Sequence, residues 1–167
     1  LYVYSADNTT LVDITPSGLT SGYVDATINT GFGGGYYGKE YYGTERTQSS
    51  VITPATTWSL DNWGEYLIAC ADSDGKIYEW QLDRSTPTVA AAISNAPTSN
   101  RSVFVTEERF IFALGAGGDP RKVQWCDRED NTNWTPAATN EAGDYILQTP
   151  GFIQTAFRVR GQTLIIT

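Results

Sequence analysis

"GEYLIACADSDGKIYEWQLD", residues 64–83, contains a short apolar run, a turn rich in Asp and Gly, and a second run that ends near a tryptophan. The same pattern returns in "ERFIFALGAGGDPRKVQWCDRE", residues 108–129. Short apolar runs bounded by turn residues are typical of strands, and these turns leave no room for a helical crossover. Each segment is therefore predicted to be an antiparallel hairpin, in which EYLIAC pairs with KIYEWQ and RFIFAL with KVQWC.

The two hairpins are spaced as a repeat. Leu67 and Ile111 are 44 residues apart, and Trp80 and Trp125 are 45 apart, so the turn of the second hairpin is expected to be one residue longer. A period near 45 residues is typical of the four-stranded blades of β-propellers. The two tryptophans are then expected at equivalent positions, on the same face of successive sheets and buried between them.

Strand-like segments around the hairpins extend the pattern. The segments at 56–60, 102–106 and 155–160 each precede an apolar run and are expected to be first strands. The last apolar run, "QTLIIT" at 162–167, is nearly continuous like the others, which is typical of strands buried on both faces. The prediction is an all-β chain made of antiparallel four-stranded blades of an open, partial β-propeller. A β-sandwich is the alternative that the strand spacing allows.

The expected organisation follows the blades. Residues 1–16 form the second half of a blade, 17–55 a Gly/Tyr-rich insertion loop, 56–95 and 101–150 one complete blade each, and 155–167 the first half of a further blade. A propeller normally closes with four or more blades. Both half-blades are therefore expected to find partners in sequence not present here or in other chains. The chain has no methionine at position 1, as expected of a processed product or of part of a longer polypeptide.

The composition narrows the function classes. The 167 residues carry a formal net charge of −8, which disfavours specific nucleic-acid binding, because phosphates are held by clustered Lys and Arg. There is no histidine, the commonest general base and a frequent metal ligand. No run of 18 apolar residues or secretion signal occurs, so no membrane insertion is expected.

Cys70 and Cys126 are expected to be buried, reduced thiols. The chain is expected not to be an enzyme.

Two motifs match the sequence patterns of ligand sites but lack the surrounding residues that those sites require. "GGGYYG", residues 33–38, matches a dinucleotide loop, but Gly43 interrupts the segment that follows and no acidic residue lies at the required distance. "DSDG", residues 72–75, lacks the spacing and the closing Glu of a calcium loop. Gly75 is instead expected to take a positive φ in a plain hairpin turn. No cofactor and no metal is therefore expected.

"GFGGGYYGKEYYG", residues 31–43, combines six glycines with five aromatic residues. A glycine-rich backbone loses much entropy on ordering, so contacts made by the aromatic side chains must compensate. Tyrosine is enriched at protein interfaces because it offers a large contact area and a polar tip. The segment is predicted to lie against a neighbouring subunit, and packing on its own domain is the alternative. The interface candidates are Phe32, Tyr36, Tyr37, Tyr41 and Tyr42.

A family resemblance adds to this interpretation. "PATTWSLDNWGEYLIACADSDGKIYEW" (54–80), the segment at 105–149 and "RVRGQTLIIT" (158–167) resemble virion structural proteins of tailed bacteriophages, and residues 1–16 resemble them more loosely. The resemblance is to the propeller-bearing stabilisation and nozzle proteins of short-tailed phages. It implies a non-enzymatic structural component of the virion, in the tail or at the head-to-tail junction. It also implies a ring of identical copies with neighbouring virion proteins as partners.

The alternative function is of another class. A carbohydrate-binding propeller, either a lectin or an inactive glycosidase relative, would recognise host surface glycan with exposed aromatic residues. Tryptophans and tyrosines around a shallow pocket lined by carboxylates would favour that alternative. Aromatic residues buried between blades would favour the structural role.

Overall fold

The computed structural model describes residues 2–4, 11–16, 56–82 and 89–167. The chain divides into two compact units, and the strands below all belong to the unit made of residues 1–19 and 57–167. The predicted interface segment at 31–43 lies outside the described residues.

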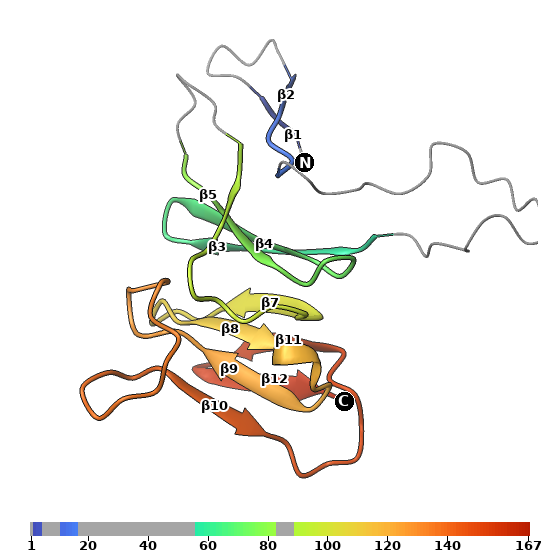
Figure 1. Cartoon of the computed structure of the whole chain (residues 1–167), viewed down its shortest axis with the longest axis vertical. Coiled ribbons are helices and arrows are strands. Elements are labelled where there is room, and N and C mark those ends of the chain that lie inside the picture. The colour runs from blue at the N-terminus through green and yellow to red at the C-terminus, as the bar shows by residue number, and fades with distance from the viewer. Residues whose placement is uncertain (1, 5–10, 17–55, 83–88) are drawn as a thin grey trace, which may run out of the picture. The chain divides into compact units, whose positions relative to one another are not determined.

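The first four-stranded sheet is a meander. Its strands are β3 (Trp58–Trp63), β4 (Tyr66–Ala71), β5 (Ile77–Trp80) and β6 (Ala91–Ala92), and they follow one another in chain order (Figure 1). All neighbours are antiparallel, and Leu67 lies opposite Trp80. The predicted pairing of EYLIAC with KIYEWQ is confirmed.

The second four-stranded sheet repeats this order. It contains β7 (Ser102–Val105), β8 (Ile111–Leu114), β9 (Lys122–Trp125) and β10 (Gly143–Ile146), with a 3₁₀ turn at Ala116–Gly118 between β8 and β9. The strands are again antiparallel, as predicted for RFIFAL and KVQWC. The predicted all-β architecture of antiparallel four-stranded sheets is confirmed, and the described sheets do not close on themselves.

One strand pair precedes these two sheets in the sequence, and another follows them. β1 (Tyr2–Tyr4) pairs with β2 (Leu11–Asp13), and β11 (Thr155–Val159) pairs with β12 (Gln162–Ile166), both antiparallel. Arg160 and Gly161 make the two-residue turn of the second pair, both with positive φ, as a type I′ turn requires.

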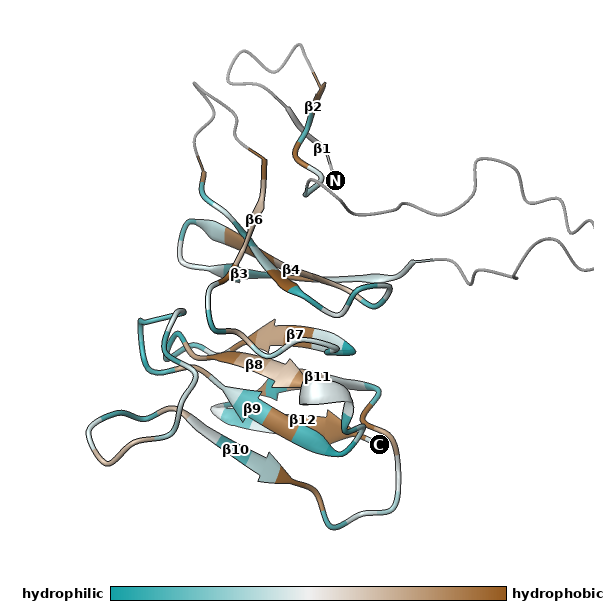
Figure 2. Ribbon diagram, viewed as in Figure 1, coloured by the Kyte–Doolittle hydropathy of each residue, from teal (hydrophilic) through white to brown (hydrophobic). Residues whose placement is uncertain are grey.

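Three apolar clusters join these sheets in chain order. The first sheet meets the second through buried residues that include Ile68, Cys70, Val103 and Ala113. Its other face meets the segment that follows β2, through Ile14. The other face of the second sheet meets the last strand pair through a third apolar cluster. Its residues include Phe104, Leu114, Val123, Ala156 and Ile165. Figure 2 shows the corresponding hydrophobic residues along β7 and β8 and toward the end of β12.

Backbone hydrogen bonds show which residues of the two sheets correspond. Opposed residues in an antiparallel sheet alternate between pairs that exchange hydrogen bonds and pairs that do not. Asp72 N donates to Thr57 O (3.1 Å), so Ile68, four positions earlier on β4, also lies in a hydrogen-bonded pair with β3. Ile68 points toward the second sheet.

Phe112 has the same place in the second sheet. Thr106 N donates to Phe110 O (3.0 Å), and Phe112 lies two positions further along β8, so it too is in a hydrogen-bonded pair with the first strand of its sheet. Phe112 packs on the cluster shared with the last strand pair. Ile68 and Phe112 therefore correspond, and each is directed at the sheet that follows in the chain.

This correspondence corrects the predicted position of the tryptophans. Leu67 corresponds to Ile111, as the sequence spacing indicates, but Trp80 lies opposite Leu67 whereas Cys126 N donates to Ile111 O (3.1 Å). The connection in the second hairpin is thus two residues longer, not one, and Trp80 corresponds to Cys126. Trp80 packs on the side of β1 and β2, whereas Trp125 packs on the side of β11 and β12. The prediction that both indoles share one face is wrong.

The turn and cysteine predictions hold. Gly75 has φ 64°, and its amide donates to Ala71 O at 2.9 Å. Cys70 and Cys126 are both free and buried. The predicted burial of 162–167 on both faces is wrong within this chain, because Leu164 and Ile166 are exposed. No helix among the described residues has the length and apolar character needed to cross a membrane.

Candidate functional site

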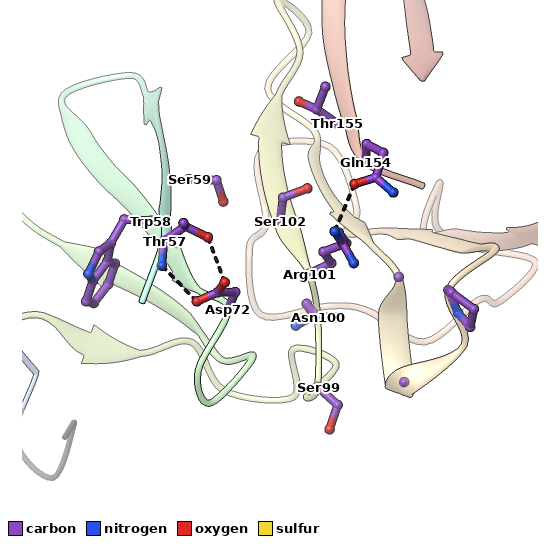
Figure 3. Close-up of a pocket in the computed structure, with 13 residues that line it drawn as sticks. Thr57, Trp58, Ser59, Asp72, Ser99, Asn100, Arg101, Ser102, Gln154 and Thr155 are labelled. Atoms are coloured by element: carbon purple, nitrogen blue, oxygen red, sulfur yellow. Dashed lines mark hydrogen bonds between the residues drawn. The ribbon is translucent and has the colours of Figure 1, made fainter. Parts of the chain in front are cut away.

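The first strands of successive sheets start around one cavity. Three pairs of residues line it at the starts of β3, β7 and β11 (Figure 3). They are Trp58 with Ser59 in β3, Arg101 just before β7 with Ser102, and Gln154 just before β11 with Thr155. The cavity has a volume of about 560 Å³.

These three pairs of residues are equivalent positions. Ser59 lies opposite Cys70, Ser102 opposite Leu114 and Thr155 opposite Ile166. Cys70 and Leu114 correspond by the hydrogen-bond pattern above. The last pair has a two-residue turn, as β3 and β4 do, so Thr155 takes the place of Ser59. A hydroxyl side chain thus recurs at the same position in all three sheets.

The charged side chains of the cavity already have partners. Asp72 accepts hydrogen bonds from Thr57 N (2.9 Å) and Thr57 Oγ1 (2.7 Å), which fixes the start of β3. Arg101 Nη2 donates to Gln154 Oε1 (2.8 Å), as the dashed lines of Figure 3 show. Asp72 is the one carboxylate among the described lining residues. Its two bonds to Thr57 mark it as a structural group.

Two buried oxygens of the lining have no hydrogen-bond partner within the described part of the chain, Asn100 Oδ1 and Ser102 Oγ. Asn100 itself is almost wholly buried, and its Nδ2 donates to Gly75 O (2.8 Å) and Pro97 O (2.5 Å). In contrast, the equivalent Ser59 Oγ accepts a hydrogen bond from Val103 N (2.9 Å). Because both unpartnered oxygens are also closed off from solvent, they do not present acceptors to a molecule in the open cavity.

The aromatic residues do not gather around this cavity. Trp58 is the one aromatic residue of the described lining, and it is half-buried against Tyr78, with ring centroids 6.5 Å apart. Trp63, Trp80 and Trp134 are buried in the core. Within the described residues, the arrangement lacks the exposed aromatic cluster expected of a glycan-binding pocket.

Polar side chains of β3 bridge the first and second sheets. Ser59 and Asp61 lie on the face that meets the second sheet, and Asp61 Oδ2 accepts from Val105 N (2.7 Å). Asp61 Oδ1 also accepts from Arg158 Nη2 of β11 (3.1 Å). One carboxylate thus connects the first strands of three successive sheets. On β7 it accepts from the N–H of Val105, which points away from β8.

The outward face of β11 and β12 is a second candidate site. It presents a row of exposed apolar side chains, which we call the terminal apolar face: Phe157, Val159, Leu164 and Ile166. Leu164 and Ile166 correspond to Ile68 and Cys70, which are fully buried against the second sheet. Large apolar side chains gathered on one face of a strand pair are typical of a surface that binds protein.

Burial alters the ionisation of three groups. It raises the pKa of the Cys70 thiol to about 12, with smaller contributions from the charges of Asp74 and Asp72. Burial likewise raises the pKa of Cys126 to about 11. It also raises the pKa of Tyr78, whose hydroxyl donates to Asp74. Both thiols therefore stay protonated and unreactive near neutral pH.

No group of three or more acidic, Cys or His side chains in the described part of the chain could hold a metal ion. The interface candidates Phe32, Tyr36, Tyr37, Tyr41 and Tyr42 all lie outside it. The sequence interpretation missed the cavity, although the pairs Trp58-Ser59, Arg101-Ser102 and Gln154-Thr155 each stand at or beside the start of a predicted first strand.

Comparison of the chain with protein-family models, with curated proteins and with solved structures gives no match.

Proposed function

We propose that this chain is a non-enzymatic structural module that acts through protein–protein contacts. The observation that carries the proposal is the terminal apolar face. Its Leu164 and Ile166 are exposed, although the corresponding residues of the first sheet are fully buried against the next sheet. Covering an apolar face of this kind with another protein is favourable, because it removes apolar surface from water.

A partial β-propeller is the architecture that we propose for the module. Corresponding residues of the two sheets are directed at the sheet that follows, as in blades related by rotation about one axis. The first strands also lie next to one another, because Asp61 of β3 binds both β7 and β11. First strands that meet in this way are expected around the central axis of a propeller. A β-sandwich remains the alternative.

From the resemblance to tailed-phage proteins we propose that this module belongs to the virion, at the tail or the head-to-tail junction. Mass spectrometry of purified particles tests this location. We expect peptides from the chain in the particles, at a copy number consistent with a symmetric assembly. Their absence from intact particles would remove the virion assignment.

The interface segment gives a second test of the assembly role. Truncating Tyr36, Tyr37, Tyr41 and Tyr42 to Ala is expected to reduce incorporation into particles more than it reduces stability. Interface tyrosines often cost on the order of 1 to 2 kcal/mol each when truncated. The paired measurement is thermal unfolding of the isolated chain beside incorporation into particles. Equal incorporation by the variant, or loss of its fold, would exclude an assembly role for this segment.

Glycan binding remains the alternative function, and the cavity beside Trp58 is the feature that favours it. Its hydroxyl and amide groups, with a tryptophan at the rim, resemble the chemistry of sugar sites. A glycan array probed with the purified chain, and with Trp58→Ala as the control, tests this function. Binding that Trp58→Ala abolishes would support it over the structural role.

A further inference from the structure

From the two ends of the sheet stack we infer that two copies of this chain join head to tail, so that β12 of one copy pairs with β1 of the other. The strand pairs of the two copies then form a composite four-stranded sheet. This inference deepens the proposed assembly role and rests on its propeller-like arrangement.

The exposed side chains at the two ends are complementary. At the trailing end, Phe157 and Leu164 are 52% and 53% exposed. At the leading end, Leu60 of β3 is 50% exposed. Its equivalent in the second sheet, Val103, is buried because the first sheet covers it. Each end thus exposes the residues that the internal junction buries, so one end can cover the other.

The strand edges match as well. In both four-stranded sheets the second strand pairs with the third, as β4 does with β5. β12 stands in the second position and β1 precedes a last strand, yet within the described residues β12 pairs with β11 alone and β1 with β2 alone. Joining β12 to β1 of another copy satisfies the free backbone groups on both edges. The resulting sheet has the same order as the two complete ones.

The number of sheets selects a pair of copies. The described residues of each copy supply two complete sheets and two half-sheets, which would make three blades if the two half-sheets met within one copy. Propellers typically have about four to eight blades. Two copies supply six, whereas three copies would exceed this range. A head-to-tail contact closes into a ring when its rotation allows, and a pair then has two identical junctions.

The hydroxyl repeat supports the same junction. Ser59 Oγ accepts from Val103 N across the internal contact, and Thr155 is equivalent to Ser59. In the joined pair, Thr155 is therefore placed to accept from the amide of Leu60 in the other copy. That amide points away from β4, because the neighbouring residues of β3 carry the hydrogen bonds to β4.

The test is the mass of the purified chain in solution, measured by sedimentation equilibrium with two complementary variants. We expect the chain at twice its 18.3 kDa mass. Leu164→Asp and Leu60→Lys should each give monomers, because either change places a charge in the apolar junction. Mixing the two variants should restore the dimer. One junction then pairs Asp with Lys and the other keeps both leucines.

The matched control is Ile146→Asp. Ile146 and Ile166 are both 42% exposed and both end a strand, but Ile146 lies opposite Lys122, on the face of the second sheet turned toward the first. Ile166→Asp should dissociate the dimer and Ile146→Asp should not. Circular dichroism of every variant separates dissociation from unfolding.

Several results would overturn the inference. A chain that stays monomeric well above micromolar concentration would do so, as would dissociation by Ile146→Asp. A dimer that survives Leu60→Lys but not Leu164→Asp would show two trailing ends face to face instead. A dimer in solution with no chain in purified virions would refute the virion assignment while leaving the inference intact.

Discussion

Replacing Asp61 by Ala is expected to weaken the junction between the first and second sheets. Its Oδ2 accepts from Val105 N at 2.7 Å, and Val105 is 1% exposed. Water cannot readily replace a lost acceptor there, and an unsatisfied buried N–H costs about 1–3 kcal/mol. The ion pair with Arg158 adds about 0–1 kcal/mol, because Arg158 is half-exposed to solvent.

Asp61→Ala should therefore lower the free energy of unfolding by about 2 kcal/mol and the midpoint temperature by about 4–8 °C. Arg158→Ala should cost at most about 1 kcal/mol. Asp61→Asn keeps an acceptor for Val105 and should fall between them. Urea unfolding at one fixed protein concentration measures all three, since self-association would otherwise change the apparent stability.

A double-mutant cycle with Arg158→Ala isolates the ion pair from the hydrogen bond to Val105. A free energy of unfolding for Asp61→Ala within about 0.5 kcal/mol of that of the unmodified chain would contradict this role of Asp61, because a stranded buried amide costs more. An Arg158→Ala variant as destabilised as Asp61→Ala would contradict it as well. In that case the exposed ion pair, and not the bond to β7, would hold the sheets together.

Two further outcomes are expected. Gly75→Ala should destabilise the chain far more than Gly117→Ala. Both glycines have positive φ (64° and 68°). A Cβ at Gly75 would lie 2.4 Å from Ser99 Cα, whereas none of the described atoms lies within 4 Å of a Cβ at Gly117. Equal midpoint temperatures would contradict this. Unfolded Cys70 ionises near pH 9 but folded Cys70 near 12, so stability should fall as pH rises above about 9, by up to about 1.4 kcal/mol per pH unit from this thiol. Urea unfolding between pH 8 and 10 should show a shallower fall for Cys70→Ala, and an unchanged slope would refute the assignment.

The hairpins could be predicted because their determinants are local. Apolar runs such as residues 66–71 and 111–114 end at Gly or Asp turns, and the turn chemistry fixes which strands become neighbours. Gly75 shows this most directly, since its positive φ follows from the turn alone.

The face occupied by Trp125 could not be predicted from spacing alone. Side chains alternate along a strand, so a residue displaced by one position from its equivalent faces the other way. The spacing from Ile111 to Trp125 is one residue longer than that from Leu67 to Trp80, whereas the connection between the strands is two residues longer. Trp125 therefore lies one residue before the position equivalent to Trp80, and the two indoles are on opposite sides although the strand order stays the same.

The contacts that build the candidate site also lack a local signal. Ser59 and Asp61 each bind an amide 44 residues later in the chain. Their polarity alone is equally compatible with solvent exposure. Only the packing of one sheet on the next shows that these polar side chains serve the junction.

For the run at 162–167, by contrast, the sequence predicts more burial than the described residues supply. Leu164, Ile165 and Ile166 are apolar on both faces of β12, as in strands covered on both sides. The second sheet covers Ile165, while Leu164 and Ile166 remain exposed. In β4 the corresponding side chains are buried by the next sheet. In the pair of copies that we propose, the first sheet of the second copy, where Leu60 is exposed, would cover this apolar surface of β12.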